Sequence, residues 1–338
     1  MGGAGLVAGT ERAVAGVVGG VGGVVDGVVD RLLDRTVVPG YSRIGYAVRR
    51  LGRDPLPDGA LLGRRVLVTG ATGGLGLAIA AGCARLGADV HVLGRDRGRG
   101  EEALRRLRPE VRGGSLTLEL CDVGSLADVR RFCADLTERV PSLDGLVHNA
   151  GTMAPERTET AEGHELTFAL HVLGPHLMTL LLADRLADAD DSRVVFMSSG
   201  GMYAQRLDVE DPELRHGRYT PTAAYARTKR MQVVLAEEWA QRLAPRGISV
   251  HGMHPGWADT GGVQQHLPVF RFVTRPILRT AEEGADTAVW LLATDDLDPA
   301  TGGFWQDRHP RPTHLLGRTR ESPADRAAFW AFCEAATA

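Results

Sequence analysis

The stretch VLVTGATGGLG, residues 66–76, decides the fold of this chain. It begins as a run of apolar and β-branched residues, typical of a buried strand, and passes through a glycine cluster into an apolar helical pattern. Because glycine has no Cβ, the backbone around Gly70, Gly74 and Gly76 can approach a pyrophosphate closely. Such a cluster is also typical of a tight turn, but its place between a strand and a helix predicts a dinucleotide-binding loop.

The same alternation of strand and helix continues along the chain. Further strands are predicted at 89–94, 115–120, 144–151, 193–199, 248–256 and 303–305, with helices at 75–86, 101–107, 126–140, 162–187, 225–243 and 281–292. This order predicts an α/β fold, a single Rossmann-type doubly wound parallel sheet of about seven strands with helices on both faces. Ligands of such sheets bind at the carboxyl ends of the strands, so motifs that follow strands are candidate site residues.

Three regions are expected. Residues 1–60 form a flexible or partly helical N-terminal extension, residues 61–316 the folded domain with substrate loops at 200–224 and 257–280, and residues 317–338 a helical tail. The longest uncharged part of the extension, residues 13–25, is too short to span a bilayer. Peripheral membrane contact through residues 1–50 is the alternative to a free leader.

Composition excludes several classes of partner. A net charge of -3 with evenly mixed arginines and acids leaves no basic face for nucleic acid. The four cysteines lack metal-ligand spacing and the histidines do not cluster, so we expect no metal. Reduced cysteines and the lack of a recognisable secretory signal predict a cytoplasmic protein, with membrane association and homo-oligomers as further expectations.

Lys229 is the only lysine among the 39 lysines and arginines. A primary amine changes its pKa readily, whereas a guanidinium is a poor proton carrier. Tyr225 lies four residues earlier, on the same face of the predicted helix, where a cation would lower the pKa of the phenol toward the range of an acid/base catalyst. This spacing is also common on exposed helices. Ser199, preferred over Ser198, ends a strand at the same edge and can hydrogen-bond a substrate oxygen.

The residues after the second and third strands indicate the cofactor. Dinucleotide folds place an acid after the second strand to bind a ribose 2′-hydroxyl, or a base to bind a 2′-phosphate. Gly94 and Arg95 favour NADP(H), while Asp96 keeps NAD(H) as an alternative. Asp122 follows the third strand and suits the adenine edge, although it could equally cap the helix that begins near Leu126.

Together the motifs resemble the short-chain dehydrogenase/reductase family over residues 61–316. The resemblance rests on TGATGGLG at 69–76, HNAG at 148–151, YARTK at 225–229 and HPGWADT at 254–260. More narrowly, SSGGMY at 198–203 and FWQDRHPRPTHL at 304–315 resemble the branch called dehydrogenase/reductase SDR family member 12. The resemblance implies an NAD(P)-dependent oxidoreductase that interconverts a carbonyl and an alcohol.

The resemblance also implies roles for single residues. Tyr225 would exchange the proton at the substrate oxygen, Lys229 would lower the pKa of the tyrosine and bind the nicotinamide ribose, and Ser199 would orient the substrate. The implied cofactor-binding residues are Gly70, Thr72, Gly73, Gly74, Leu75, Gly76, Arg95, Asp122, Val123, Asn149, Ala150, Gly151, Tyr225, Lys229, Pro255, Gly256 and Thr260.

His171 departs from the family pattern, which has an asparagine that is thought to hold a proton-relaying water. The histidine could bind that water, carry the proton itself, block the relay, or pack in the core without a catalytic role. Two functions follow. The first is an NADP(H)-dependent oxidoreductase for a hydrophobic small molecule. Its apolar mouth would be formed by Trp257, Leu267, Pro268, Val269, Phe270 and Phe272, which could equally be packing residues. The second is a catalytically weak NADP(H)-binding sensor or scaffold, against which Tyr225 and Lys229 argue because a sensor needs no proton donor.

Overall fold

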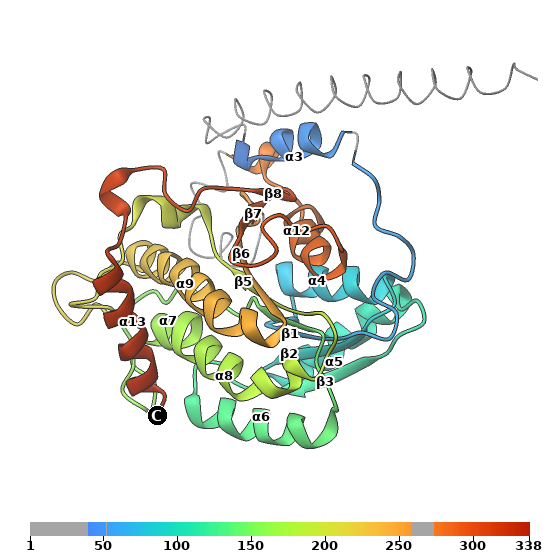
Figure 1. Ribbon diagram of the computed structural model, residues 1–338, viewed down its shortest axis with the longest axis horizontal. Helices are drawn as coiled ribbons and strands as arrows, with labels where there is room; N and C mark the ends of the chain where they lie inside the picture. The colour runs from blue at the N-terminus through green and yellow to red at the C-terminus, as the bar shows by residue number, and fades with distance from the viewer. Residues whose placement is uncertain (1–39, 52, 259–273) are drawn as a thin grey trace, which may run out of the picture.

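The computed structural model describes residues 40–51, 53–258 and 274–338 (Figure 1). Its sheet has the order β3-β2-β1-β4-β5-β6-β7-β8, with every described pair parallel except β7 and β8. The strands are β1 Arg65–Thr69, β2 Asp89–Gly94, β3 Leu116–Leu120, β4 Gly145–His148, β5 Ser192–Met197, β6 Ile248–Met253, β7 Phe304–Gln306 and β8 His309–Pro310. The predicted doubly wound α/β fold is confirmed, and β8 adds a short antiparallel strand to the seven expected.

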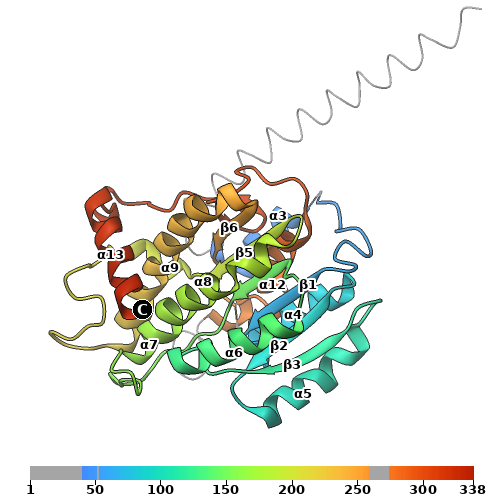
Figure 2. The ribbon, with the colours of Figure 1, turned by 60° about the horizontal axis from the view of Figure 1, so that its bottom comes forward.

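Helices cover both faces of the sheet (Figure 2). The α-helices are α3 Arg43–Arg50, α4 Gly74–Arg85, α5 Arg97–Leu107, α6 Leu126–Arg139, α7 Leu166–Phe168, α8 Gly174–Ala187, α9 Pro221–Leu243, α12 Ala281–Ala293 and α13 Pro323–Ala336. Shorter 3₁₀ segments are η1 Arg108–Glu110, η3 Gly200–Ala204, η4 Ala244–Arg246, η5 Arg275–Ile277 and η6 Gly317–Thr319. Alternate residues of β1 show the two layers, since Val66 and Val68 pack with α4 and α12 and Leu67 packs with α6 and α8.

The helix predicted over 162–187 is divided in the structure. An isolated bridge pairs Glu159 with Glu165, and α7 is followed by a π-helical segment, η2, at Ala169–Leu173, before α8 begins. The segment Leu166–Ala187 is apolar enough to span a membrane, but 78% of its most apolar window is buried inside the protein, as in a core helix. The π-helical turn contains His171. Such turns are frequent at functional sites.

Both ends of the described chain pack on the central domain. Helix α3, within the extension predicted for 1–60, docks beside β7 and β8, so the folded body includes Gly40–Leu51 and does not begin near residue 61 (Figure 1). Helix α13 packs on α8 and α9 through Trp330, whose ring centroid lies 4.9 Å from that of Trp239. Residues 1–39 lie outside the described part of the chain.

Candidate active site

The glycine-rich loop joins β1 to α4. Gly70 and Gly74 have φ angles of 65° and 54°, a region that other residues rarely adopt. A Cβ on Gly76 would lie 2.3 Å from the Gly70 carbonyl oxygen. The N-cap of α4 is Gly73, which has no side chain to accept the first amides, and the first turn has no acidic residue. These amides and the positive end of the helix dipole fit a cofactor pyrophosphate.

Hydrogen bonds fasten this loop to the end of β4. The Oγ1 of Thr69 accepts the backbone amides of Asn149 and Ala150, both at 2.9 Å, and donates to the Val147 carbonyl oxygen at 3.1 Å. The Nδ2 of Asn149 donates to the Thr69 carbonyl oxygen at 2.9 Å. These hydrogen bonds therefore hold the carboxyl ends of β1 and β4 together and fix the start of the glycine loop.

The end of β2 has no room for an acid that would bind a ribose 2′-hydroxyl. A Cβ on Gly94 would lie 2.4 Å from Cγ2 of Thr72, so a larger side chain at this position would have to move the Thr72 side chain of the glycine loop. The next residue, Arg95, is exposed. A guanidinium at this position matches the phosphate-pairing group predicted from the sequence.

Asp96, which kept NAD(H) as an alternative, is engaged in helix capping. Its Oδ1 accepts the backbone amide of Arg99 at 2.7 Å and caps α5. The Nη2 of Arg99 lies 3.9 Å from the position that a Cβ on Gly73 would take. The Arg99 guanidinium therefore lies against the glycine loop. We did not predict this residue, because Arg95 precedes α5 and only the fold brings the two arginines to the same loop.

Asp122 does not cap the helix that follows it. Its Oδ1 accepts the Gly124 amide at 2.9 Å, whereas the N-cap of α6 is Ser125. The carbonyl oxygen of the next residue, Val123, lies 2.0 Å from the position that a Cβ on Gly174 would take. The turn at the end of β3 is thus held both by its own aspartate and by close contact with α8.

The two serines after β5 face different partners. The Oγ of Ser198 is buried and donates to the Lys229 carbonyl oxygen at 2.7 Å. Ser199 is only partly buried and its side chain interacts with that of Tyr225, with an effect on the pKa of the phenol that is smaller than, and opposite to, the raising effect of burial. The hydroxyl that meets the tyrosine is therefore that of Ser199, as preferred from the sequence.

Tyr225 and Lys229 lie on one face of α9. The Nζ of Lys229 is buried, donates to the Met197 carbonyl oxygen at 2.7 Å and to Oε1 of Gln232 at 2.8 Å, and lies 5.3 Å from the centroid of the Tyr225 ring. Gln232 was not predicted. It lies three residues beyond Lys229, so it can share the helix face, but only the fold shows that it is buried there.

The pKa relation between these two residues differs from the expected one. Burial lowers the pKa of Lys229 to about 7, because the ammonium has been removed from water. The pKa of Tyr225 is raised, since burial outweighs the hydrogen bond with Ser199. The expected lowering of the pKa of Tyr225 by Lys229 is therefore not found. The phenol stays protonated at neutral pH, whereas the pKa of Lys229 lies close to neutral pH.

His171 links the loop after β4 to the catalytic helix. Its Nε2 lies 3.1 Å from the backbone nitrogen of Thr152 and its Nδ1 lies 2.7 Å from Oγ1 of Thr228. Because a backbone N–H only donates, Nε2 is the acceptor, and we assign the proton to Nδ1. The Thr228 hydroxyl in turn donates to the Tyr225 carbonyl oxygen at 2.9 Å. Both nitrogens of this buried ring are engaged within the protein.

This geometry favours one of the roles considered for His171, that of a positioning residue. The pKa of the ring is far below 6.5, first because of burial and then because of the nearby Lys229 charge, so the ring stays neutral. A ring with both nitrogens engaged neither binds a relay water nor exchanges protons without breaking a hydrogen bond. A Cβ on Gly151 would lie 2.9 Å from Nε2, so the loop is shaped around the histidine. The residue positions two segments of the site.

The end of β6 is packed against α3. Gly256 has a φ of 71°, and a Cβ there would lie 2.5 Å from Cζ of Arg279 and 2.7 Å from the Tyr41 carbonyl oxygen. The carbonyl oxygen of Pro255 accepts from Nη1 of Arg279 at 3.2 Å. Thr260, predicted at the same end of the cofactor, lies outside the described residues.

Comparisons with known proteins agree with this site. Residues 64–210 match the short chain dehydrogenase family model. The chain is 38% identical to dehydrogenase/reductase SDR family member 12 of Bos taurus, with 84% of this chain and 90% of that protein covered. It is 35% identical to retinol dehydrogenase 14 of Mus musculus, with 76% and 80% covered. The solved Pseudomonas aeruginosa RhlG/NADP complex has a TM-score of 0.60 at 25% identity, with 73% and 96% covered.

The chain belongs to the short-chain dehydrogenase/reductase family. The resemblance inferred from the motifs is thereby confirmed, and the chain is an NAD(P)-dependent oxidoreductase that acts on a carbonyl or an alcohol. The structure brings the family motifs together at one edge of the sheet. Thr69 contacts the loop after β4, His171 joins that loop to α9, and Tyr225 meets Ser199.

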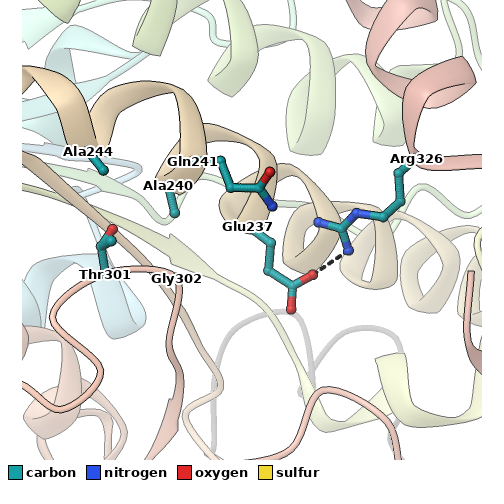
Figure 3. A pocket seen from close by; sticks show the side chains of 7 residues that line it. All are labelled: Glu237, Ala240, Gln241, Ala244, Thr301, Gly302 and Arg326. Carbon is teal, nitrogen blue, oxygen red and sulfur yellow. Dashed lines mark hydrogen bonds and ion pairs between the residues drawn. The ribbon is translucent and has the colours of Figure 1, made fainter. Parts of the chain in front are cut away.

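Other features of the described chain lie away from this site. A hollow beside the C-terminal half of α9 contains an ion pair between Glu237 and Arg326 (Figure 3). It is lined by Glu237, Ala240, Gln241, Ala244, Thr301, Gly302 and Arg326. Tyr225 lies about three helical turns earlier on α9, so the hollow is not part of the catalytic edge. Residues 40–51, 53–258 and 274–338 contain no group of three or more metal-ligating side chains.

Proposed function

We propose that this chain is an NADP(H)-dependent reductase of hydrophobic carbonyl compounds, with Tyr225 as the proton donor. The observation that carries the proposal is the contact of Tyr225 with Ser199 on one side and with the ammonium of Lys229 beneath its ring. The phenol stays protonated at neutral pH because burial raises its pKa, as a donor to a carbonyl oxygen requires. The hydroxyl of Ser199 would hold the same oxygen.

The cofactor preference is supported by the end of β2. Arg95 and Arg99 supply two guanidinium groups, Gly94 excludes an acid, and Asp96 is engaged in capping α5. When bound, the nicotinamide supplies the hydride, and the protein supplies position and the proton. Lys229, with a pKa of about 7, can return a proton to the phenolate left after each turnover. Gln232 and the Met197 carbonyl oxygen hold its Nζ in place.

An apolar substrate is supported by the side chains next to Ser199. A cluster of Tyr41, Met202, Tyr203, Val233 and Phe304, with Trp257 packed against it, borders the segment that follows this serine. The name of the relative retinol dehydrogenase 14 refers to an apolar alcohol, which agrees with such a lining. Residues 267–272, expected to extend the mouth, lie outside the described residues.

Turnover with a panel of aldehydes, ketones and quinones tests the proposal. Wild-type protein is titrated with NADPH and NADH by fluorescence, and oxidation is then followed at the nicotinamide absorption band. Two single variants, Arg95→Ala and Arg99→Ala, should each weaken NADPH binding by roughly tenfold and leave NADH binding nearly unchanged. Equal loss for both cofactors would contradict the assigned phosphate contacts. Tight NADPH binding without turnover on any carbonyl would favour the sensor.

A further inference from the structure

Helix α3 has an inverted distribution of polar and apolar side chains. Its inward face consists of Gly45, Tyr46 and Arg49, all three of which are buried. Its outward face carries Ile44 and Val48, with Leu51 at the C-cap, and these side chains are 57%, 36% and 74% exposed. A soluble helix normally buries its apolar stripe and exposes its arginines. Here the apolar stripe points to the outside.

The inward face is fastened to the active site by a buried ion cluster. Arg49 donates to Oδ2 of Asp307 at 2.9 Å, and Arg279 donates to both oxygens of the same carboxylate at 2.5 and 2.9 Å. Asp307 and Arg308 have φ angles of 52° and 55°, a strained turn for residues other than glycine. The turn holds the carboxylate between two buried guanidinium groups, so the orientation of α3 is fixed.

Tyr41, just before α3, joins this helix to the reacting end of the site. A Cβ on Gly200, the residue after Ser199, would lie 2.6 Å from the Tyr41 ring. The Tyr41 carbonyl oxygen accepts the Trp257 amide at 2.8 Å, in the loop after β6. The segment that leads into α3 therefore packs beside the catalytic serine.

We propose that the outward face of α3, formed by Ile44, Val48 and Leu51, docks on an anionic phospholipid surface and sets the substrate entrance against it. Arg50 and Arg43 are exposed and flank the apolar positions, with Arg43 also paired to Glu283 at 3.0 Å, and α3 itself has no acidic residue. An apolar stripe bordered by arginines matches the boundary between acyl chains and anionic headgroups.

The sequence before α3 adds to this argument. Residues 13–25 are uncharged and rich in glycine and valine, and they precede the docking face by fewer than twenty residues. Three of the seven exposed large apolar side chains in the described chain lie on or at the end of α3. The delivery of a lipid-dissolved carbonyl compound to Ser199 rests on the proposed function, whereas the docking itself does not.

Sedimentation with vesicles tests the docking without cofactor or substrate. Full-length protein is mixed with vesicles of phosphatidylcholine, with and without phosphatidylserine. We expect the wild type to sediment with the anionic vesicles and to be released by salt. The variant Ile44→Ser/Val48→Ser/Leu51→Ser should bind roughly tenfold more weakly or less, because the apolar area that enters the lipid is lost.

The matched control is Leu62→Ser/Leu180→Ser/Leu315→Ser, which removes three exposed apolar side chains from other places. It should sediment like the wild type, and both triple variants should keep the wild-type circular dichroism spectrum. Equal sedimentation of the α3 variant and the wild type would overturn the proposal, as would a wild type that binds neither kind of vesicle. A wild-type dimer that the α3 substitutions convert to a monomer would assign the face to a second copy instead.

Turnover of a water-soluble carbonyl compound by the α3 variant separates the two proposals. Unchanged turnover with lost vesicle binding supports docking and leaves the catalytic assignment intact. Unchanged vesicle binding in a protein without turnover would overturn only the reductase.

Discussion

Replacement of His171 by asparagine distinguishes a positioning residue from a proton carrier. The ring accepts the Thr152 amide and donates to Thr228, both in buried surroundings. An asparagine is shorter and reaches at most one of these partners. One or two partners are then left without a hydrogen bond, at about 1–3 kcal/mol each, so we expect the free energy of unfolding to fall by about 1–6 kcal/mol.

The kinetic consequence follows from the same two contacts. Because Thr228 bonds the Tyr225 carbonyl oxygen, release of the histidine loosens the first turns of α9 and the loop after β4 together. A misplacement of about 1 Å near the reacting atoms costs up to 100-fold in rate, so kcat should fall by roughly ten- to 100-fold. The pH dependence of kcat between pH 5 and 7 should stay unchanged, because a ring whose pKa lies far below 6.5 does not titrate there.

The assay is a pH profile of kcat combined with denaturant unfolding. His176→Phe is the control, since His176 is a second buried histidine, five residues later, packed between Trp239 and Trp330. It should alter neither kcat nor the profile. An ionisation between pH 5 and 7 that disappears in His171→Asn but persists in His176→Phe would refute the positioning role. Higher turnover in His171→Asn would refute it as well, because the asparagine would then have restored a relay.

Three further predictions concern other parts of the molecule. Burial lowers the pKa of Lys229 from 10.5 to about 7, so the unfolded chain binds the extra proton between these values and the lysine's contribution to stability rises with pH. The free energy of unfolding of the wild type minus that of Lys229→Met should therefore increase by up to about 1.4 kcal/mol per pH unit from pH 7 to 10, and a flat difference would contradict the buried ammonium. Asp307→Asn should raise the KM for NADPH and lower the melting temperature, because two buried guanidinium groups lose their counter-charge. A decrease of less than about 1 kcal/mol in the free energy of unfolding would contradict a stabilising role of this buried ion cluster. Truncation after Arg320, which removes α13 with Trp330, should expose Trp239 and its neighbours and lead to self-association in analytical ultracentrifugation, whereas a stable monomer would show that α13 is dispensable.

The sequence predicts those parts of the site that depend on neighbours along the chain. The glycine loop follows a buried strand, and Tyr225 and Lys229 share a helix face, so residue spacing alone places them. Features formed by distant residues could not be read in this way. Arg49 meets Asp307 across 258 positions, and His171 meets Thr228 across 57.

Burial accounts for the remaining differences. The sequence indicates that an ammonium near a phenol lowers the pKa of the phenol. The fold buries both groups, and this desolvation raises the pKa of Tyr225 and lowers that of Lys229. The sequence predicts a flexible or partly helical extension at 1–60, whereas in the structure Gly40–Leu51 packs on the domain through polar groups that are not apparent from an apolar pattern.

The central claim is tested most directly by NADPH oxidation in the presence of carbonyl compounds, with wild type and Tyr225→Phe compared at equal cofactor saturation. The account predicts turnover by the wild type, a loss of roughly 100-fold or more in kcat for the variant, and an NADPH dissociation constant that changes little, because only the phenolic hydroxyl is removed. Equal turnover by Tyr225→Phe would contradict the assignment of the proton donor. A wild type that binds NADPH but reduces none of the carbonyl compounds would contradict the reductase itself.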